Sequence, residues 1–381
     1  DNEYANLKLI CDSIFGENNF VTTCVWQKIH SIKNDAKYLS VNHDYVLIYA
    51  KQIESVHINL LGRTEEMNAR YKNPDNDPRG VWQSGDLVAN ETRVNGNYDV
   101  IGPTGTVFNV PDGKHWVYSE ENMRELIADN RIWFGKNGTS FPRKKRFLSE
   151  VQSGRTPDTW WRNEEVGHNQ EGARDLKKIL GTVALNNPKP VRLINRVLQI
   201  ASQPNSIILD FFAGSGTTAQ AVMELNIVDG GNRSFILCTN NENGICENVT
   251  YPRVKTVITG KRTDGSEYSK GILANVKYYR TDFVSKDEEY LSDALLEHIA
   301  EMVQLEHGVK IDGSRYLIVM DDDEADALLA HWEDYPDVQA LYVSRNVLFT
   351  TEQNALLAGT EIHIIPDYYF NFELKEVGET W

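Results

Sequence analysis

The stretch that decides the fold reads Ile207-Ile208-Leu209-Asp210-Phe211-Phe212-Ala213-Gly214-Ser215-Gly216-Thr217-Thr218-Ala219. Apolar residues and one acid lead into a glycine turn, and small hydroxyl residues then open an amphipathic segment that reaches Leu225. This order predicts a strand, a tight turn and a helix. The glycines let the backbone approach a ligand closely, and the helix start offers unpaired N–H groups. Because Asp210 would repel a phosphate, the turn suits a cationic or hydroxyl-bearing ligand.

Other interpretations of the turn are weaker. A phosphate-binding P-loop needs a lysine after its second glycine, and none follows Gly216. A dinucleotide fingerprint is formally present at Gly214, Gly216 and Ala219, but Asp210 argues against it. A strand-to-helix turn that binds no ligand stays open as an alternative.

The turn and its neighbours resemble one family of enzymes. Residues 210–218 are similar to the methyl-donor motif of DNA methyltransferases that methylate amino groups, in the form common among adenine-N6 and cytosine-N4 enzymes. Residues 186–194 resemble the Lys-Pro segment that precedes this motif in the permuted group of the family. Residues 26–28 and 42–51 resemble its late core strands. Residues 243–260 resemble the methylation (Mod) subunit of type III restriction–modification systems.

The resemblance implies S-adenosylmethionine as the cofactor and indicates which residues contact it. In the family an acid at the end of the second strand holds the ribose hydroxyls, and here Glu242 stands about three residues late, with Asn240 as a neutral substitute. The expected cofactor contacts are Lys189, Pro190, Asp210, Phe211, Phe212, Ala213, Gly214, Ser215, Gly216, Thr217, Thr218, Asn240 and Glu242.

One motif of the family is missing from the sequence. Its enzymes carry an Asp-Pro-Pro-Tyr type motif that binds the target amine and stacks an aromatic ring on the flipped base. Asn73-Pro74-Asp75 has the wrong order, and Pro366-Asp367-Tyr368-Tyr369 stands in the wrong region. Asp1-Asn2-Glu3-Tyr4 resembles the end of the strand that follows the motif. We therefore expect the catalytic residues upstream of Asp1. We expect this chain alone to bind cofactor weakly or not at all and not to methylate.

Composition and charge bound the remaining possibilities. Of the 381 residues, 41% are hydrophobic and 25% are charged, which is ordinary for a soluble globular protein. No apolar run approaches the roughly 20 residues of a membrane span. Because its four cysteines lack Cys-x-x-Cys spacing, the sequence predicts free thiols in a reduced cytoplasm and no zinc site.

A net charge of −16 looks wrong for a protein that binds DNA, but the charge is unevenly distributed. Residues 261–381 hold ten Lys and Arg against twenty-five Asp and Glu, which accounts for nearly all the excess. Residues 131–178 hold eleven Lys and Arg against six acids. Because a phosphate-binding surface needs only local positive charge, this middle region stays a candidate for nucleic-acid contact.

Residues 52–160 read as an irregular β-rich insert with hairpin signals such as Asn95-Gly96 and Asn137-Gly138. Ser119 predicts the cap of a short helix that reaches Asp129. The resemblance places a target-recognition domain here, and basic and aromatic residues suit contacts to DNA. Core packing is an equal alternative for Trp160 and Trp161, and a solvated surface turn is the alternative for the basic run. The expected DNA contacts are Arg143, Lys144, Lys145, Arg146, Arg155, Trp160 and Arg162.

The last third of the chain predicts a separate small α/β domain. We expect a helix over residues 287–305, a strand at 316–320, a helix at 324–332 and strands at 338–343 and 361–365. The carboxylates at 321–324 could bind Mg²⁺, but such a run more often charges the next helix start, so no metal site is predicted. The resemblance implies that this domain assembles with a second Mod copy or with the restriction (Res) subunit.

Together these observations predict an α/β protein built on a doubly wound, seven-stranded methyltransferase sheet. The expected domains are residues 1–51 (part of the catalytic half), 52–175 (target recognition), 176–276 (cofactor half) and 277–381 (assembly). The expected function is methyl transfer from S-adenosylmethionine to adenine N6 in double-stranded DNA, by a homodimeric subunit of a type III restriction–modification system. A cytosine-N4 methyltransferase and a non-catalytic recognition and assembly subunit stay open as alternatives, with a nicotinamide enzyme a distant third.

Overall fold

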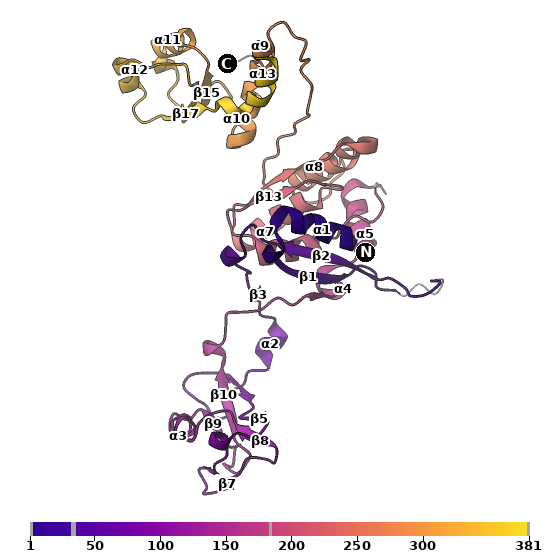
Figure 1. Ribbon diagram of the computed structural model, residues 1–381, viewed down its shortest axis with the longest axis vertical. Coiled ribbons are helices and arrows are strands. Elements are labelled where there is room, and N and C mark those ends of the chain that lie inside the picture. The colour runs from indigo at the N-terminus through magenta and orange to yellow at the C-terminus, as the bar shows by residue number, and fades with distance from the viewer. Residues whose placement is uncertain (1–2, 32–35, 183–184, 379–381) are drawn as a thin grey trace. The chain divides into compact units, whose positions relative to one another are not determined.

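The computed structural model describes residues 3–31, 36–182 and 185–378 of this mixed α/β protein (Figure 1). The chain divides into two compact units, Asp1–Tyr278 and Tyr279–Trp381. No helix of the described residues is long and apolar enough to cross a bilayer.

The first unit contains a three-stranded sheet that mixes both strand directions. β1 (Phe20–Gln27) lies between β2 (His43–Tyr49), to which it is antiparallel, and the short parallel strand β12 (Trp160–Trp161). Helix α1 (Tyr4–Phe15) contacts β2. Side chains from this sheet, β3 (Leu61–Gly62), α4 (Asn163–Val166) and α6 (Val191–Ala201) meet in one apolar cluster, which includes Cys24, Trp26, Leu61, Trp161, Val166 and Leu193. Because Trp161 is wholly buried there, the core-packing alternative holds for this residue.

The predicted strand, turn and helix are confirmed around the glycines. β13 (Ile207–Asp210) pairs in parallel with β14 (Ser234–Leu237), and α7 (Thr217–Asp229) follows the turn. Helices α5 (Asn169–Leu180), α6 (Val191–Ala201) and α8 (Tyr251–Thr259) complete this half, and the apolar clusters join α6 to α7 and α5 to α7 and α8.

Two expectations about this half need correction or stay untested. Helix α7 is not amphipathic, because every residue from Thr217 to Met223 is buried between neighbouring helices. The described strands of the core form two ladders, of three and two strands, and the expected seven-stranded sheet stays a prediction. One face of the smaller ladder leaves its apolar side chains exposed, namely Ile207, Leu209 and Ile236.

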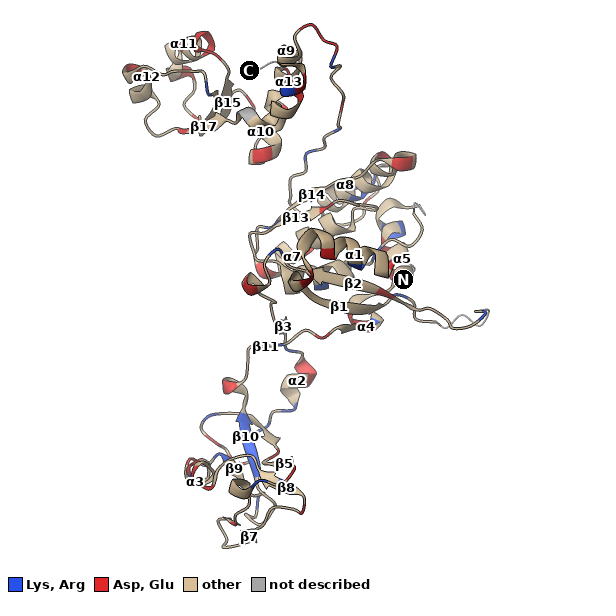
Figure 2. Cartoon of the chain, viewed as in Figure 1, with Lys and Arg blue, Asp and Glu red and all other residues tan. Residues whose placement is uncertain are grey.

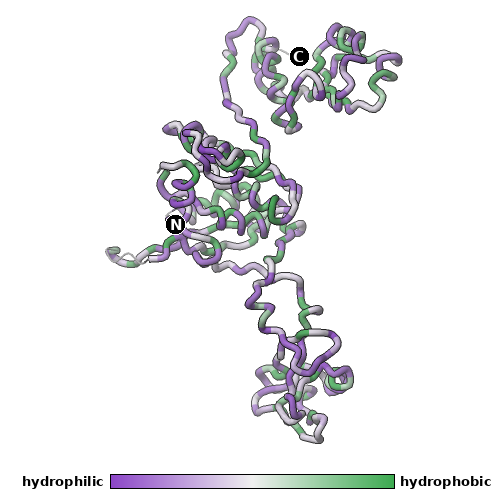
Figure 3. The backbone as a smooth tube through the Cα atoms, turned by 180° about the vertical axis from the view of Figure 1, so that it is seen from behind, coloured by the Kyte–Doolittle hydropathy of each residue, from purple (hydrophilic) through white to green (hydrophobic). Residues whose placement is uncertain are grey.

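The insert is a set of short β elements around its own apolar cluster, and hydrophilic residues prevail along it (Figure 3). β4 (Trp82–Gly85), β10 (Arg143–Phe147) and β9 (Ile132–Trp133) form one sheet. Three two-stranded ladders join β5 (Val88–Asn90) to β8 (Lys114–Trp116), β6 (Val100–Ile101) to β7 (Val107–Phe108), and β3 (Leu61–Gly62) to β11 (Gly154–Arg155). Helix α2 spans Glu65–Ala69. The predicted capped helix is confirmed as α3 (Glu120–Ala128), whose Asn122 amide donates to Ser119 Oγ.

The second unit confirms the predicted alternation of helices and strands. β15 (Tyr316–Val319), β16 (Ala340–Ser344) and β17 (Glu361–Ile365) form a parallel sheet in that order. Alternate residues of β16 enter two apolar clusters, one with α9 (Leu291–Leu296), α10 (Ile299–His307) and α13 (Asn371–Val377), the other with α11 (Asp322–Ala330) and Leu357, which follows α12 (Thr351–Leu356).

Two details of this unit differ from expectation or refine it. The single helix expected over residues 287–305 is two helices, because His298 leaves the helical conformation between them. Both helices still bury residues at the four-residue spacing of one helix face, Leu291, Leu295, Ile299 and Val303, in the same cluster. The acidic run after β15 caps α11, since the Glu324 amide donates to Asp321 Oδ1 at 2.8 Å.

Candidate functional site

The glycine turn connects β13 to α7 through two residues in the left-handed conformation, Gly214 (φ +51°) and Gly216 (φ +73°). The Gly216 amide closes the turn on the Ala213 carbonyl at 2.7 Å. The Ala213 amide in turn donates to the Cys238 carbonyl at 3.0 Å, so the segment after β14 lies beside the turn. A Cβ atom on Gly216 would lie 3.2 Å from Thr250, the residue before α8, and 3.4 Å from Val254 in α8, and the first of these is closer than ordinary van der Waals contact. The turn therefore rests directly on α8.

The side chain of Asp210 bridges the two ends of this turn. One carboxylate oxygen accepts the Phe212 amide at 3.1 Å, and the other accepts the Thr218 hydroxyl at 2.6 Å. Each oxygen carries a further lone pair, so the carboxylate keeps capacity for a ligand donor. Its first effect is nevertheless local, because it ties the end of β13 to the first turn of α7.

Of the four amides from Ala213 to Gly216, two have no acceptor within the part of the chain that the structure describes. They are the N–H groups of Gly214 and Ser215. Backbone amides in folded proteins are nearly always bonded to protein or water, so this pair marks a position for a ligand acceptor or for water. They stand at the N-terminal end of α7, where the helix dipole also favours negative charge.

The opposite side of the turn is occupied by α8 and the residue before it. The Thr250 hydroxyl donates to the Gly214 carbonyl at 2.6 Å. The guanidinium of Arg253, which is 1% exposed, donates to the Ser215 carbonyl at 3.3 Å and to the hydroxyls of Ser215 and Thr217 at 2.9 and 2.7 Å. Sequence reasoning missed both residues.

The Lys-Pro segment also reaches the turn. The Thr217 hydroxyl donates to the Lys189 carbonyl at 3.2 Å, and Pro190 is buried at the start of α6. The Lys189 ammonium lies 3.4 Å from Asp44 Oδ2 and 4.8 Å from the centre of the Trp26 ring. Although burial acts to raise the pKa of Asp44, its hydrogen bond with Lys28 and the charge of Lys189 hold that pKa below the ordinary value.

The remaining expected cofactor contacts lie near the turn with their side chains exposed. Phe211 and Phe212 are 66% and 92% exposed, which is unusual for aromatic rings next to a buried turn. Asn240 and Glu242 follow β14, and the Asn240 side chain accepts the Glu242 amide at 3.2 Å. The structure thus brings together Lys189, the turn and the end of β14, while the ribose role of Asn240 or Glu242 stays a prediction.

The basic run of the insert forms strand β10, seen as the blue strand in Figure 2. Arg143 forms an ion pair with Asp86, and the Lys144 ammonium lies 4.6 Å from the centre of the Tyr118 ring. Arg146 is exposed and has no ion pair within the described residues. Of the four expected DNA contacts in this run, Arg146 is the one whose charge is most available.

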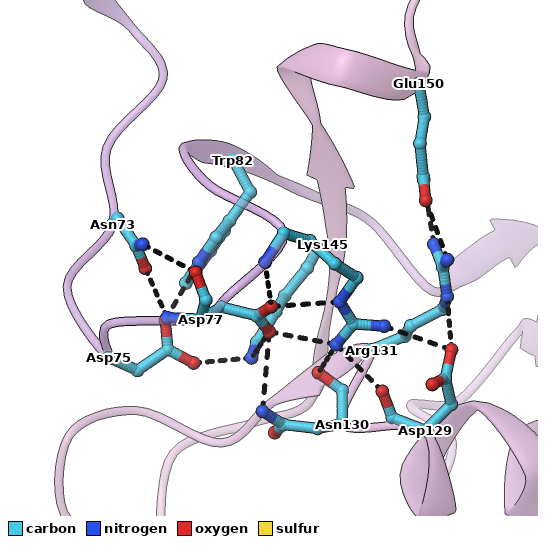
Figure 4. Close-up of polar contacts among 10 residues, drawn as sticks. Asn73, Asp75, Asp77, Trp82, Asp129, Asn130, Arg131, Lys145 and Glu150 are labelled. Atoms are coloured by element: carbon cyan, nitrogen blue, oxygen red, sulfur yellow. Dashed lines mark hydrogen bonds and ion pairs between the residues drawn. The ribbon is translucent and has the colours of Figure 1, made fainter.

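Lys145 does not fit its expected role, because strand alternation turns it inward and its side chain is 0% exposed. Its ammonium forms ion pairs with Asp75 and with Asp77, the latter at 3.0 Å (Figure 4). Asp77 is also bonded twice by the Arg79 guanidinium at 2.9 Å. The Arg79 hydrogen bond, followed by that of Lys145, holds the pKa of Asp77 well below its usual range. This cluster is structural: it closes residues 73–79 onto β10.

The other expected DNA contacts lie outside the apolar cluster of the insert. Arg155 in β11 pairs with Glu165 at 2.9 Å, and Arg162 is exposed just before the short helix α4 (Asn163–Val166). Trp160 is half exposed, at 50%. Arg155 and Trp160 belong to ladders other than the sheet that holds Arg146.

Comparisons with known proteins give the chain a family. The sequence pattern described as DNA methylase matches residues 1–247, well over half of the chain. The chain is 37% identical over 243 residues to the type III restriction-modification enzyme StyLTI Mod subunit of Salmonella typhimurium, covering 63% of this chain and 36% of that protein. It is 29% identical over 262 residues to the type II methyltransferase M.KpnI of Klebsiella pneumoniae, covering 63% and 60%.

A third relative is also named as a type III Mod subunit. The chain is 28% identical over 276 residues to the type III restriction-modification enzyme EcoPI Mod subunit of Escherichia phage P1, covering 64% of this chain and 41% of that protein. The chain therefore spans between about a third and three fifths of the length of these relatives. With the glycine turn, the Lys-Pro segment and a match over residues 1–247, the chain belongs to the DNA methylase family.

Proposed function

We propose that this chain is part of a site-specific DNA methyltransferase that methylates adenine N6, acting as the methylation subunit of a type III restriction–modification system. The observation that carries the proposal is the glycine turn, which leaves two amides without a protein acceptor in a chain of the DNA methylase family. The names of two relatives as type III Mod subunits support the type of system.

The residues of the turn fit S-adenosylmethionine, which when bound supplies an activated methyl group. The free amides of Gly214 and Ser215 suit its carboxylate, because N–H groups at a helix start bind anions. The exposed rings of Phe211 and Phe212 offer apolar contact to an adenine. Asn240 and Glu242 supply polar groups for ribose hydroxyls. Lys189 would form part of the wall, since its carbonyl is held against Thr217.

We assign DNA contact to the exposed cations, with Arg146 in the insert and Arg162 beside the core sheet as the first candidates. Exposed guanidinium groups bind phosphates and base edges, whereas the ion-paired Lys145 would have to break its buried contacts first. The adenine amine is unreachable inside the duplex, so the target base must be flipped out of the stack at a cost of a few kcal/mol.

The proposal extends to the domain plan and the partners. The two core ladders would belong to one doubly wound methyltransferase sheet, with residues 52–175 reading the target and residues from 277 onward assembling with a second copy or with the restriction subunit. The parallel sheet and two apolar clusters of residues 279–381 support an independent role for that unit.

Calorimetric titration of S-adenosylmethionine into this chain tests the proposal. We expect weak, saturable binding by the native chain and no measurable binding by Asp210→Ala, because that variant unties the turn from α7. Asp229→Ala is the matched control, since Asp229 lies at the far end of the same helix and pairs with Arg233. Absence of binding by a folded native chain, or equal binding by both variants, would refute the proposed site.

A further inference from the structure

Arg253 is a buried cation whose hydrogen bonds all lead to the glycine turn or the first turns of α7. Besides its three bonds to Ser215 and Thr217, it donates twice to Gln220 Oε1, at 3.1 and 2.9 Å. A guanidinium has five N–H donors in a fixed planar fork, so it can hold several acceptors in one geometry. Through this one side chain, α8 binds three residues that are close to one another in sequence, Ser215, Thr217 and Gln220.

The acceptors of Arg253 are all neutral, and no ion pair of Arg253 is found in the described ranges 3–31, 36–182 and 185–378. Burying a charge without a bonded counter-charge is costly. Burial accordingly lowers the pKa of Arg253 to about 10, which leaves it charged at neutral pH. An apolar residue would pack α8 against α7 without this cost, so packing alone does not explain an arginine at this position.

Geometry shows what the arginine does to the turn. Thr250 and Arg253 draw the carbonyls of Gly214 and Ser215 toward α8. In a planar trans peptide the C=O and the next N–H point in opposite directions. The Thr250 bond to the Gly214 carbonyl therefore turns the Ser215 amide, one of the two free amides of the turn, away from Thr250. In the same way the Arg253 bond to the Ser215 carbonyl orients the Gly216 amide, which closes the turn on Ala213.

We infer that Arg253 is a positioning residue, which together with Thr250 fixes the peptide orientation of the glycine turn so that its free amides face the methyl donor. The inference rests on the proposed function, because the ligand is the one proposed for that site. Arg253 itself does not contact the ligand; it acts through Ser215 and Thr217.

The test compares Arg253→Lys with Arg233→Lys. Lysine keeps the charge but cannot bridge three acceptor residues, so only the fork is lost. Arg233 is a matched control: it is 7% exposed and bonds Ser202 together with Asn226 and Asp229 at the opposite end of α7. Two quantities are measured, the affinity for S-adenosylmethionine by calorimetry and the hydrogen exchange of the Ala213 and Gly216 amides without ligand.

We expect Arg253→Lys to weaken binding roughly tenfold, since hydrogen bonds from a charged group are lost. Exchange of the Ala213 and Gly216 amides should accelerate in the same variant. Arg233→Lys should change affinity by less than about twofold even if it lowers the melting temperature as much.

Two results would overturn the inference and can be told apart. If the native chain binds and Arg253→Lys binds equally well with unchanged exchange, Arg253 is only a packing residue and the proposed function stands. If the folded native chain does not bind at all, the proposed function fails, and the inference about a methyl-donor site fails with it.

Discussion

Two buried cations in this protein are held in opposite ways. Lys145 in the insert is 0% exposed and is paired with two carboxylates, whereas Arg253 in α8 is 1% exposed and is bonded only to hydroxyl, carbonyl and amide oxygens. The first arrangement balances charge and closes a loop onto a strand. The second gives the cation no directly bonded carboxylate, although the charges of Asp175 and Glu224 act on it, and it controls a turn with free amides.

The difference separates a structural role from a positioning role. A buried ion pair whose members satisfy each other has no further group to act on, so its removal should affect the stability of its own region. A buried cation bonded to the backbone and hydroxyls of a turn should affect what that turn binds. The predictions below test this separation, beginning with the largest expected effect.

Lys145→Met should produce the largest loss of stability. It leaves Asp75 and Asp77 beside an apolar side chain, and breaking a buried ion pair by removing one partner costs about 3–5 kcal/mol. Hydrogen exchange of residues 143–147 should rise strongly, while binding of S-adenosylmethionine stays unchanged. Lys136→Met is the control, because Lys136 is exposed in the same insert. Weaker cofactor binding by Lys145→Met would contradict the separation.

Acid should affect the regions around the two cations differently. In the insert, the free energy of unfolding should fall by a value on the order of 2 kcal/mol. The hydrogen bond from Arg79, followed by Lys145, lowers the pKa of Asp77 in the folded state. Its stabilisation is therefore complete above the unfolded pKa near 3.9 and is lost as pH falls toward the folded pKa. The acceptors of Arg253 are neutral and lose nothing by protonation.

The unfolding free energy of the insert should thus be flat above about pH 5 and fall below about pH 4. Asp77→Asn removes the titrating group, so its unfolding free energy should depend less steeply on pH, although the variant is less stable at neutral pH. Hydrogen exchange of the amides of residues 143–147, followed from pH 6 to pH 3, measures the pH dependence of this free energy. Equal slopes in both proteins would show that Asp77 does not carry the acid dependence.

The sequence predicted the turn well because every signal for it is local. Asp210, the glycines and the hydroxyl residues are consecutive, and their identities alone specify a strand, a turn and a helix. The contacts of Lys145 are not local. Four consecutive cations suggest a solvated surface, and only the folding of residues 73–79 against β10 brings Asp75 and Asp77 to Lys145.

Arg253 illustrates a signal that sequence reasoning could have used. It stands with Thr250, Val254 and Val257 at helical spacing, so a charged residue occupies the buried face of a helix. That pattern predicts a buried partner, but not which one, because Ser215 and Gln220 come from a separate element. Likewise the burial of α7 from Thr217 to Met223 depends on α5, α6 and α8 and cannot be inferred from the sequence of α7 itself.

The smallest expected effect comes from adding one methyl group at either end of α7. Gly216 and Gly230 flank this helix with nearly equal φ values, +73° and +70°, so alanine is strained by about 1–2 kcal/mol at both. A Cβ atom at Gly230 meets nothing within 4 Å, whereas at Gly216 it lies 3.2 Å from Thr250. Thermal unfolding of Gly216→Ala and Gly230→Ala measures the difference.

Only the alanine at Gly216 should also push the turn away from α8. Gly216→Ala should therefore be the less stable variant and the one with weaker S-adenosylmethionine binding, while Gly230→Ala pays only the backbone strain. Displacing the turn would lengthen the hydrogen bond from Thr250 to the Gly214 carbonyl. It would thereby weaken the constraint that directs the Ser215 amide. If both variants lose equal stability and bind equally, close contact with α8 does not set the geometry of the turn, and the contrast between Arg253 and Lys145 reduces to charge balance alone.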